Sequence, residues 1–152
     1  MKTEYINPFL DAFNNVVQQT MNITAEKKQL YIKEGSQKSG EVVISIGITG
    51  DLNGNFILNM KEDTAKNVAS KMMMGMPVAE LDDMAKSAIA ELGNMVAGNA
   101  ASNFSSTGLK IDITPPSMYT GRDMSIFSYK AKTICIPMDI ENNVVEIDVA
   151  LS

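Results

Sequence analysis

Two extended segments separated by a turn are the feature that most restricts the fold. In Val42–Thr49, apolar side chains alternate with others at a period of two, and Gly50–Asn55 is rich in turn-forming residues. Phe56–Met60 then resumes the extended pattern, so we expect an antiparallel hairpin. Further strands are predicted over Lys110–Thr114, Ser125–Met138 and Val144–Leu151.

Two amphipathic helices are predicted around this hairpin. The first runs from about Pro8 to Met21, with Asn7 as its capping residue and Pro8 in its first turn. The second runs over Asp63–Met74 and ends at Gly75, which suits a left-handed cap. The run Met72–Met76 is rich in methionine, which favours flexible core filling and leaves open an adaptable binding surface.

A third and longer helix is predicted to begin with Asp82 or Asp83 as its cap and to end near Asn103. Helices grouped between hairpin-connected strands indicate an α+β fold, an antiparallel sheet covered by helices on one face. The long strand Ser125–Met138 loses its alternation near Thr133, which predicts a bulge or a change of environment there. With 152 residues, we expect one domain over residues 1–152.

Charge and residue types exclude several classes of function. Thirteen basic against eighteen acidic residues give a net charge of −5, so nucleic acid and anionic membrane surfaces are poor partners. The sequence has neither a signal segment nor a run of about 18 apolar residues, so we expect a cytoplasmic protein. The absence of histidine excludes His-based triads and His-ligated metals, and Cys135, in the apolar run Ile134–Ile136, is interpreted as a core thiol. No metal site is expected.

The third helix carries the candidate site. At the helical period, one arc holds a predicted core stripe of Ala85, Ala88, Ile89, Leu92, Met95, Val96 and Asn99. A separate arc holds Ser87, Glu91, Asn94 and Gly98, with the small residues Ala90, Ala97 and Ala101 on or beside it. Small residues around one acid and one amide would let another backbone approach closely. The spacing alone also allows plain exposed polar residues beside small residues that pack under another element.

The stretch Ser87–Asn99 resembles the signature helix of the CheC, CheX and FliY chemotaxis phosphatases. In that family an Asp or Ser precedes a Glu by four residues, and an Asn follows that Glu by three, as Ser87, Glu91 and Asn94 do here. The hairpin, the Asn7-Pro8 helix start and the closing strands extend the resemblance over nearly the whole chain. It is nearest to CheX, which has a single signature helix, and so implies a CheX-like (CheC-like) domain.

The resemblance implies dephosphorylation of the response regulator CheY, or a related receiver domain, within the regulator's own active site. Asn94 would position the attacking water, Glu91 would pair with the regulator's lysine, and Ser87, Ala90 and Gly98 would lie in the contact. The Mg²⁺ would belong to the regulator, and the chain would need no cofactor of its own.

The resemblance also implies a homodimer that joins its sheets edge to edge, for which the closing strands could supply the edge. Two alternatives stay open. The helix could dock on a receiver domain or a flagellar switch component as an adaptor without turnover. The chain could also be an oligomerisation module in which the Glu91 face has no role.

Overall fold

The computed structural model describes residues 3–152, apart from the side chains of residues 128–131. A short 3-10 turn, η1 (Thr3–Tyr5), precedes the first helix. The helices are α1 (Asn7–Met21), α2 (Glu62–Met72) and α3 (Asp83–Ser105). The strands are β1 (Glu26–Lys27), β2 (Tyr31–Lys38), β3 (Val42–Gly50), β4 (Gly54–Met60), β5 (Ile111–Ile113), β6 (Ser117–Thr120), β7 (Ser125–Ile140) and β8 (Asn143–Leu151).

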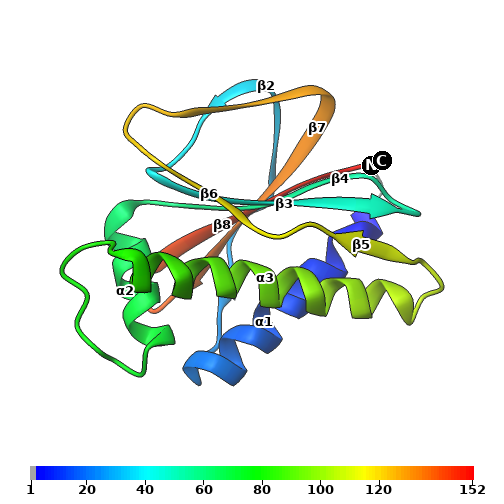
Figure 1. Cartoon of the computed structure of the whole chain (residues 1–152). Coiled ribbons are helices and arrows are strands. Elements are labelled where there is room, and N and C mark those ends of the chain that lie inside the picture. Colours follow the sequence, from blue (N-terminus) through cyan, green and yellow to red (C-terminus); the bar gives the residue numbers. More distant parts are fainter. Residues whose placement is uncertain (1–2) are drawn as a thin grey trace.

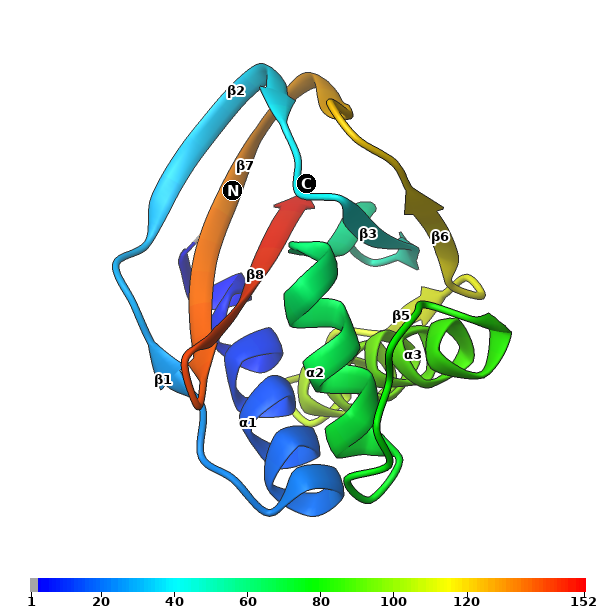
Figure 2. The same ribbon diagram turned by 90° about the vertical axis from the view of Figure 1, so that its left-hand side faces the viewer.

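The strands form one antiparallel sheet in the order β1-β7-β8-β4-β3-β5, with β2 also paired to β7 and β6 to β3. The three helices cover one face of this sheet, while β2 and the first part of β7 curve over the other face (Figures 1 and 2). The predicted α+β class and the predicted hairpin, now β3 and β4, are confirmed.

The predicted irregularity in the long strand is confirmed as a shift in its pairing with β2. Glu34 pairs with Lys132, but the next residue, Gly35, pairs with Ser128. The ladder therefore shifts just before Thr133. Such a shift increases local twist, which fits the way the β2–β7 pair bends away from the sheet (Figure 1).

The core lies between the sheet and the helices. Val42, Ile44, Ile46 and Ile48, which share one face of β3, are all buried there. On the helical side, the Phe9 ring stacks on Phe56 at 5.1 Å between centroids and meets Phe104 edge-on at 5.6 Å. Burying a side chain of this size stabilises the fold by roughly 1.5–3 kcal/mol, so these contacts hold α1 and α3 against the sheet.

The helix ends agree with the prediction in part. Asp82 caps α3, and its Oδ1 accepts a hydrogen bond from the backbone N–H of Ala85 at 2.9 Å. The prediction that Asn7 caps α1 is wrong, because Ile6 holds that position and no side chain caps the helix there. Ile6 is buried, so packing fixes the helix start one residue earlier. Gly75 adopts the expected left-handed conformation with φ 86°, and Met74 does so as well.

The methionine run divides between core and surface. Met72 and Met73 pack against the core, as predicted, whereas Met74 and Met76 are exposed. Core filling is therefore the wrong interpretation for the last two, which lie on the connection between α2 and α3.

Strand β8 lies inside the sheet, between β7 and β4. The expectation that the closing strands supply a free edge is therefore wrong for β8. Strands β1, β2 and β6 were not predicted. No helix in residues 3–152 combines the length and apolar character needed to cross a membrane.

Candidate functional site

Helix α3 rests on the sheet through its smallest residues. A Cβ added to Gly93 would lie 3.0 Å from Cγ2 of Ile44, tighter than an ordinary contact. Ala97, at 1% exposure, and Ala100 are also buried against the core. The helix can approach the sheet closely along this line because no long side chain separates them.

Because of this packing, the buried side of α3 is turned about the helix axis relative to the side that the helical period predicted. Ala85, Ile89, Leu92 and Val96 are buried as predicted. Ala88 and Met95 are half-buried but pack against the core, as predicted. Asn99 is half-buried and is not a member of the core, so its assignment to the stripe is wrong. Ala97, placed beside the exposed arc by the sequence pattern, is buried instead. The buried side of α3 thus combines small residues with Ile89, Leu92 and Val96.

The opposite side of α3 carries the candidate residues. Ser87 and Glu91 are exposed, and Asn94, Ala90 and Gly98 are half-buried. Glu91 and Asn94 are three residues apart on the helix, so their side chains are neighbours on one face. A Cβ added to Gly98 would meet nothing within 4 Å, which leaves open space at that point.

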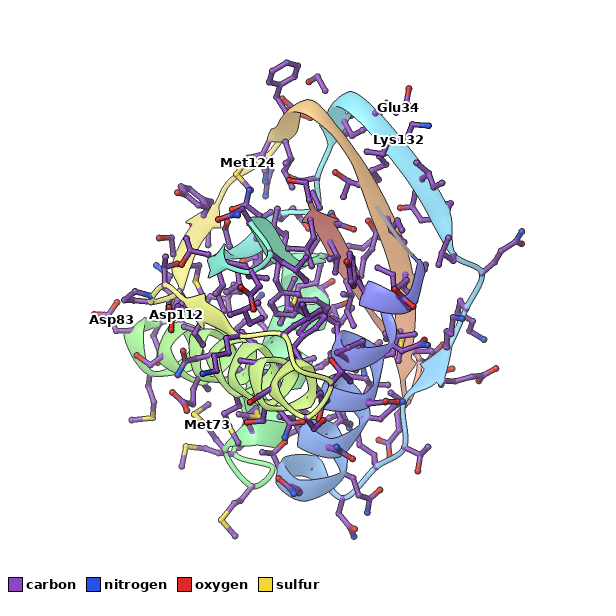
Figure 3. The ribbon with its side chains drawn as sticks, turned by 90° about the vertical axis from the view of Figure 1, so that its right-hand side faces the viewer. Glu34, Met73, Asp83, Asp112, Met124 and Lys132 are labelled. Carbon is purple, nitrogen blue, oxygen red and sulfur yellow. The ribbon has the colours of Figure 1, made fainter. Side chains whose placement is uncertain are left out.

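Glu91 and Asn94 are free to interact with another molecule. Among the residues that the structure describes, neither side chain forms a hydrogen bond or an ion pair. Helix α3 lies on one side of the helical layer, beside β5 (Figure 2), and Figure 3 shows it nearly end-on with Asp83 in its first turn. These residues therefore stand on the convex outer surface of a helix, a shape that enters a partner's cavity rather than enclosing a small molecule.

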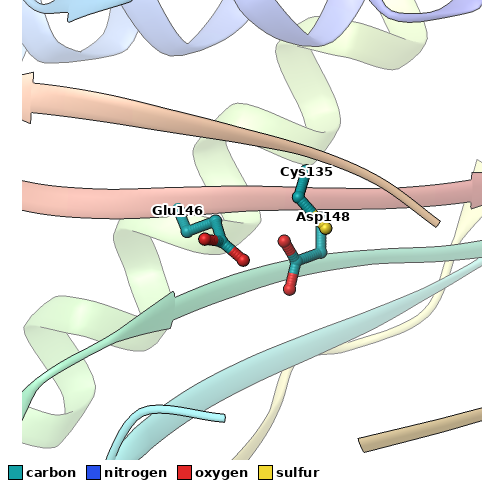
Figure 4. Close-up of side chains that lie close together, drawn as sticks. All are labelled: Cys135, Glu146 and Asp148. Carbon is teal, nitrogen blue, oxygen red and sulfur yellow. The ribbon is translucent and has the colours of Figure 1, made fainter. Parts of the chain in front are cut away.

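The other face of the sheet carries a polar cluster that sequence reasoning missed. Cys135 of β7 and Glu146 and Asp148 of β8 converge there (Figure 4), and we call these three residues the acid–thiol cluster. Glu146 Oε1 accepts a hydrogen bond from Lys33 Nζ at 2.8 Å, and the Tyr31 hydroxyl donates to Glu146 Oε2. The alternation along β8 places Asp148 on the face of the strand opposite its apolar residues. The side chain is nevertheless buried, because β2 curves over that face.

Burial and charge displace the pKa values of the cluster. Burial first, and then the neighbouring Glu146, raise the pKa of Asp148 to about 8. Burial alone would raise the pKa of Glu146, but hydrogen bonds from Asp148, Lys33 and Tyr31 outweigh it and lower that pKa. Burial raises the pKa of the Cys135 thiol, whereas for Lys33 the pairing with Glu146 outweighs burial and raises the pKa. Asp148 is therefore largely protonated at neutral pH.

Comparison with known proteins relates the α3 site to one family. The family model for the chemotaxis phosphatase CheX matches residues 42–139, which include the whole of α3. The CheY-P phosphatase CheX of Thermotoga maritima is 47% identical over 88 residues, a match that covers 58% of this chain and 57% of that protein. The matched part thus spans little more than half the length of that relative.

Solved structures are similar over the whole chain. A CheC-like superfamily protein from Shewanella sp. PV-4 superposes with a TM-score of 0.89 at 25% identity, covering 100% of this chain and 99% of that one. CheX in the CheX–CheY–BeF3–Mg²⁺ complex from Borrelia burgdorferi superposes with a TM-score of 0.82 at 29% identity, covering 99% of each chain.

Proposed function

Because this chain belongs to the CheX family of chemotaxis phosphatases, we propose that it accelerates hydrolysis of the aspartyl phosphate of CheY or a related receiver domain. The observation that carries the proposal is the pair Glu91 and Asn94, which stand unpaired on the outer face of α3 within the part of the chain described. A related CheX has been solved in complex with CheY, which supports a receiver domain as the partner.

In the proposed mechanism, α3 enters the active site of the regulator. The Asn94 carboxamide both donates and accepts hydrogen bonds, so it can hold a water molecule in line with the phosphorus without repelling the phosphoryl group. The water attacks phosphorus, the bond from phosphorus to the aspartyl oxygen breaks, and inorganic phosphate leaves the regenerated carboxylate. Orientation of this kind lowers the barrier without any group of this chain bonding to phosphorus.

Glu91 serves binding in this mechanism. A carboxylate close to a phosphoryl group is a poor base, but it can pair with the lysine of the regulator and anchor the helix. The residues around Glu91 have short side chains or none: Ser87, Ala90 and Gly98. The regulator can therefore approach the helix backbone closely. The Mg²⁺ belongs to the regulator in this proposal, as the Mg²⁺ in the related complex suggests, and the chain supplies no cofactor to the reaction.

The decisive experiment measures the lifetime of a phosphorylated receiver domain with a substoichiometric amount of this protein. We expect Asn94→Ala to reduce the stimulated rate by two orders of magnitude or more, down to the regulator's own rate. Binding should persist in this variant. Glu91→Lys should weaken the complex instead. Asn15→Ala, at an exposed position of α1, serves as the matched control.

The same assay separates the alternatives. An adaptor would bind the receiver domain but could not shorten the phosphoryl lifetime over many equivalents. An oligomerisation module would show neither binding nor turnover that depends on Glu91 and Asn94. Full stimulated activity in the Asn94 variant would refute the proposed mechanism.

We also propose that residues 1–152 form a single domain that acts in the cytoplasm as a homodimer, without nucleic acid or membrane as a partner. The net charge of −5 supports the last point. Because β8 is internal, the edges left for a second copy in residues 3–152 are those of β1 and β2 on one side and of β5 and β6 on the other.

A further inference from the structure

The acid–thiol cluster lies on the opposite face of the sheet from α3 and has no part in the proposed hydrolysis. Cys135 and Asp148 are directly opposite each other across the β7–β8 ladder, and Glu146 lies two residues before Asp148 on the same side of β8. One ligand atom from each of the three side chains lies within 4.8 Å of the others. Side chains fixed on neighbouring strands hold such an arrangement more firmly than side chains on loops.

Beside its contacts with Glu146 and Cys135, Asp148 keeps one buried oxygen that has no donor among the described residues. The residue is only 3% exposed, and its Oδ1 accepts no hydrogen bond from any residue that the structure describes. A buried carboxyl oxygen without a partner is costly, so native structures normally satisfy it with a donor, a water molecule or a cation. Figure 4 shows the Asp148 carboxyl group beside the Glu146 carboxyl group and the Cys135 sulfur.

The charges around the cluster match a divalent cation. A Cys135 thiolate and two carboxylates would carry three negative charges, and the Lys33 ammonium, 2.8 Å from Glu146, offsets one of them. The remaining charge of about −2 equals that needed to neutralise one divalent ion. Lys33 and Tyr31 hold both oxygens of Glu146 in place, as hydrogen-bonded neighbours commonly do for metal-binding carboxylates.

An ion could reach the cluster from a cavity. Asp148 and Lys33 line a cavity of about 410 Å³ between the curved β2–β7 pair and the sheet, together with Ser45, Ile57 and Ile126. The cavity has room for water molecules to complete the coordination of an ion. A sulfur ligand combined with carboxylate oxygens favours zinc over magnesium or calcium, which prefer oxygen alone.

We propose that Cys135, Glu146 and Asp148 bind one Zn²⁺ ion, with water from the cavity in the remaining position. Cys135 binds the ion as a thiolate and releases its thiol proton into solvent, so no oxidant or reductant is involved. The site is independent of the proposed phosphatase function, since it lies across the sheet from Glu91 and Asn94.

The test uses the full chain, stripped of metal with a chelator and titrated with Co²⁺ as a spectroscopic probe for the zinc site. We expect one Co²⁺ per chain, an absorption band from thiolate-to-cobalt charge transfer, and loss of that band when Zn²⁺ is added. Zn²⁺ should also raise the thermal midpoint.

Variants assign the ligands. Cys135→Ser should abolish the charge-transfer band, and Asp148→Asn should weaken binding at least tenfold. Asp112→Asn removes an exposed carboxylate on β5 and should leave binding unchanged. If either cluster variant fails to fold, the Co²⁺ and Zn²⁺ binding of the wild-type chain still decides the question. No band and no Zn²⁺ retained in equilibrium dialysis, or binding that survives in Cys135→Ser, would overturn the proposal. Asp148 would then simply share a proton with Glu146.

Discussion

At the scale of single residues, two glycines of α3 separate folding from recognition. Gly93 faces the sheet, where an added Cβ would press on Ile44, whereas Gly98 faces open space. A glycine in the middle of a helix costs about 1 kcal/mol relative to alanine. The contact of Gly93 with the sheet explains its presence, but no contact among the described residues explains Gly98. Close approach of a partner is the explanation that our proposal offers.

Leucine at each position makes this difference measurable. Gly93→Leu should lower the free energy of unfolding by roughly 1–3 kcal/mol because it overpacks the contact with β3. Gly98→Leu should keep or slightly raise stability, since it adds a helix-favouring residue in open space. Binding to the phosphorylated receiver domain should nevertheless weaken. Urea denaturation and a binding titration of both variants check the pair, and equal binding by Gly98→Leu would contradict close approach there.

Asp148 predicts how stability depends on pH in the metal-free protein. Its pKa rises from an ordinary value of 3.8 to about 8 on folding, so the folded state holds the proton more tightly than the unfolded chain does. The stability from this group is therefore complete below about pH 4 and is lost as the pH rises toward 8. Glu146 contributes in the opposite sense, because its pKa is lowered and its contribution is lost in acid.

Asp148→Asn should remove the decline at higher pH. Among the described residues, Glu146, Lys33, Tyr31 and Cys135 face Asp148 or its neighbour Glu146, and all four remain in this variant. We expect the free energy of unfolding to fall between about pH 5 and pH 9 in the wild type and to fall less in the variant. Urea titrations with a chelator present measure both slopes. Parallel slopes would show that Asp148 is not the responsible group.

At the scale of elements, the start of α3 is fixed by one side chain. The hydrogen bond from the Ala85 N–H to Asp82 satisfies one of the donors left free in the first turn. Asp82→Ala should therefore lower the free energy of unfolding by about 1 kcal/mol. Asp82→Asn keeps a side-chain oxygen that can accept the hydrogen bond, so its free energy of unfolding should stay close to that of the wild type. Asp83→Ala, one residue further on, controls for loss of charge near the helix start. An equal loss in Asp82→Asn and Asp82→Ala would contradict the capping role.

The elements that sequence patterns identified are those whose buried apolar residues recur at the period of a helix or of a strand. Helices α1, α2 and α3 and strands β3, β4, β7 and β8 all have that character, and each was predicted close to its observed bounds. Strand β2 was missed because its residues stay exposed or half-buried along the whole strand, so no apolar alternation marks it. Its structure comes from pairing with β7, a contact distant in the sequence.

The candidate site was predictable to a similar degree. The helical period alone brought Glu91, Asn94 and Gly98 to one face. On that face the structure leaves Glu91 exposed and the other two half-buried. The depth to which Ala97 is buried was not predictable, because it depends on how closely α3 approaches Ile44 through Gly93. The acid–thiol cluster was hidden for the same kind of reason. Its members meet only through the β7–β8 register.

At the scale of the whole molecule, the sheet separates two polar surfaces. One is the outer face of α3, and the other is the acid–thiol cluster on the opposite side of the sheet. No described strand covers the far edges of β2 and β6, and exposed edges of this kind commonly pair with a second chain. The proposed homodimer can therefore form through a sheet edge while α3 stays free for a receiver domain.

Light scattering over a dilution series tests this arrangement. We expect the mass of two chains at micromolar concentration. The Glu91→Lys and Asn94→Ala variants should show the same mass, because these side chains lie on the outer face of α3 and not on a strand edge. The mass of one chain at every concentration would contradict the dimer. Loss of the dimer in the α3 variants would instead place the contact on the helix.

Cys135 is the only cysteine of the chain and is completely buried on β7. Thiol-directed dyes and spin labels should therefore leave the natural protein almost unmodified in its folded state. A cysteine introduced at exposed Ser87 would then be the one reactive position on the surface. A fluorophore attached there would report the arrival and departure of a receiver domain in real time.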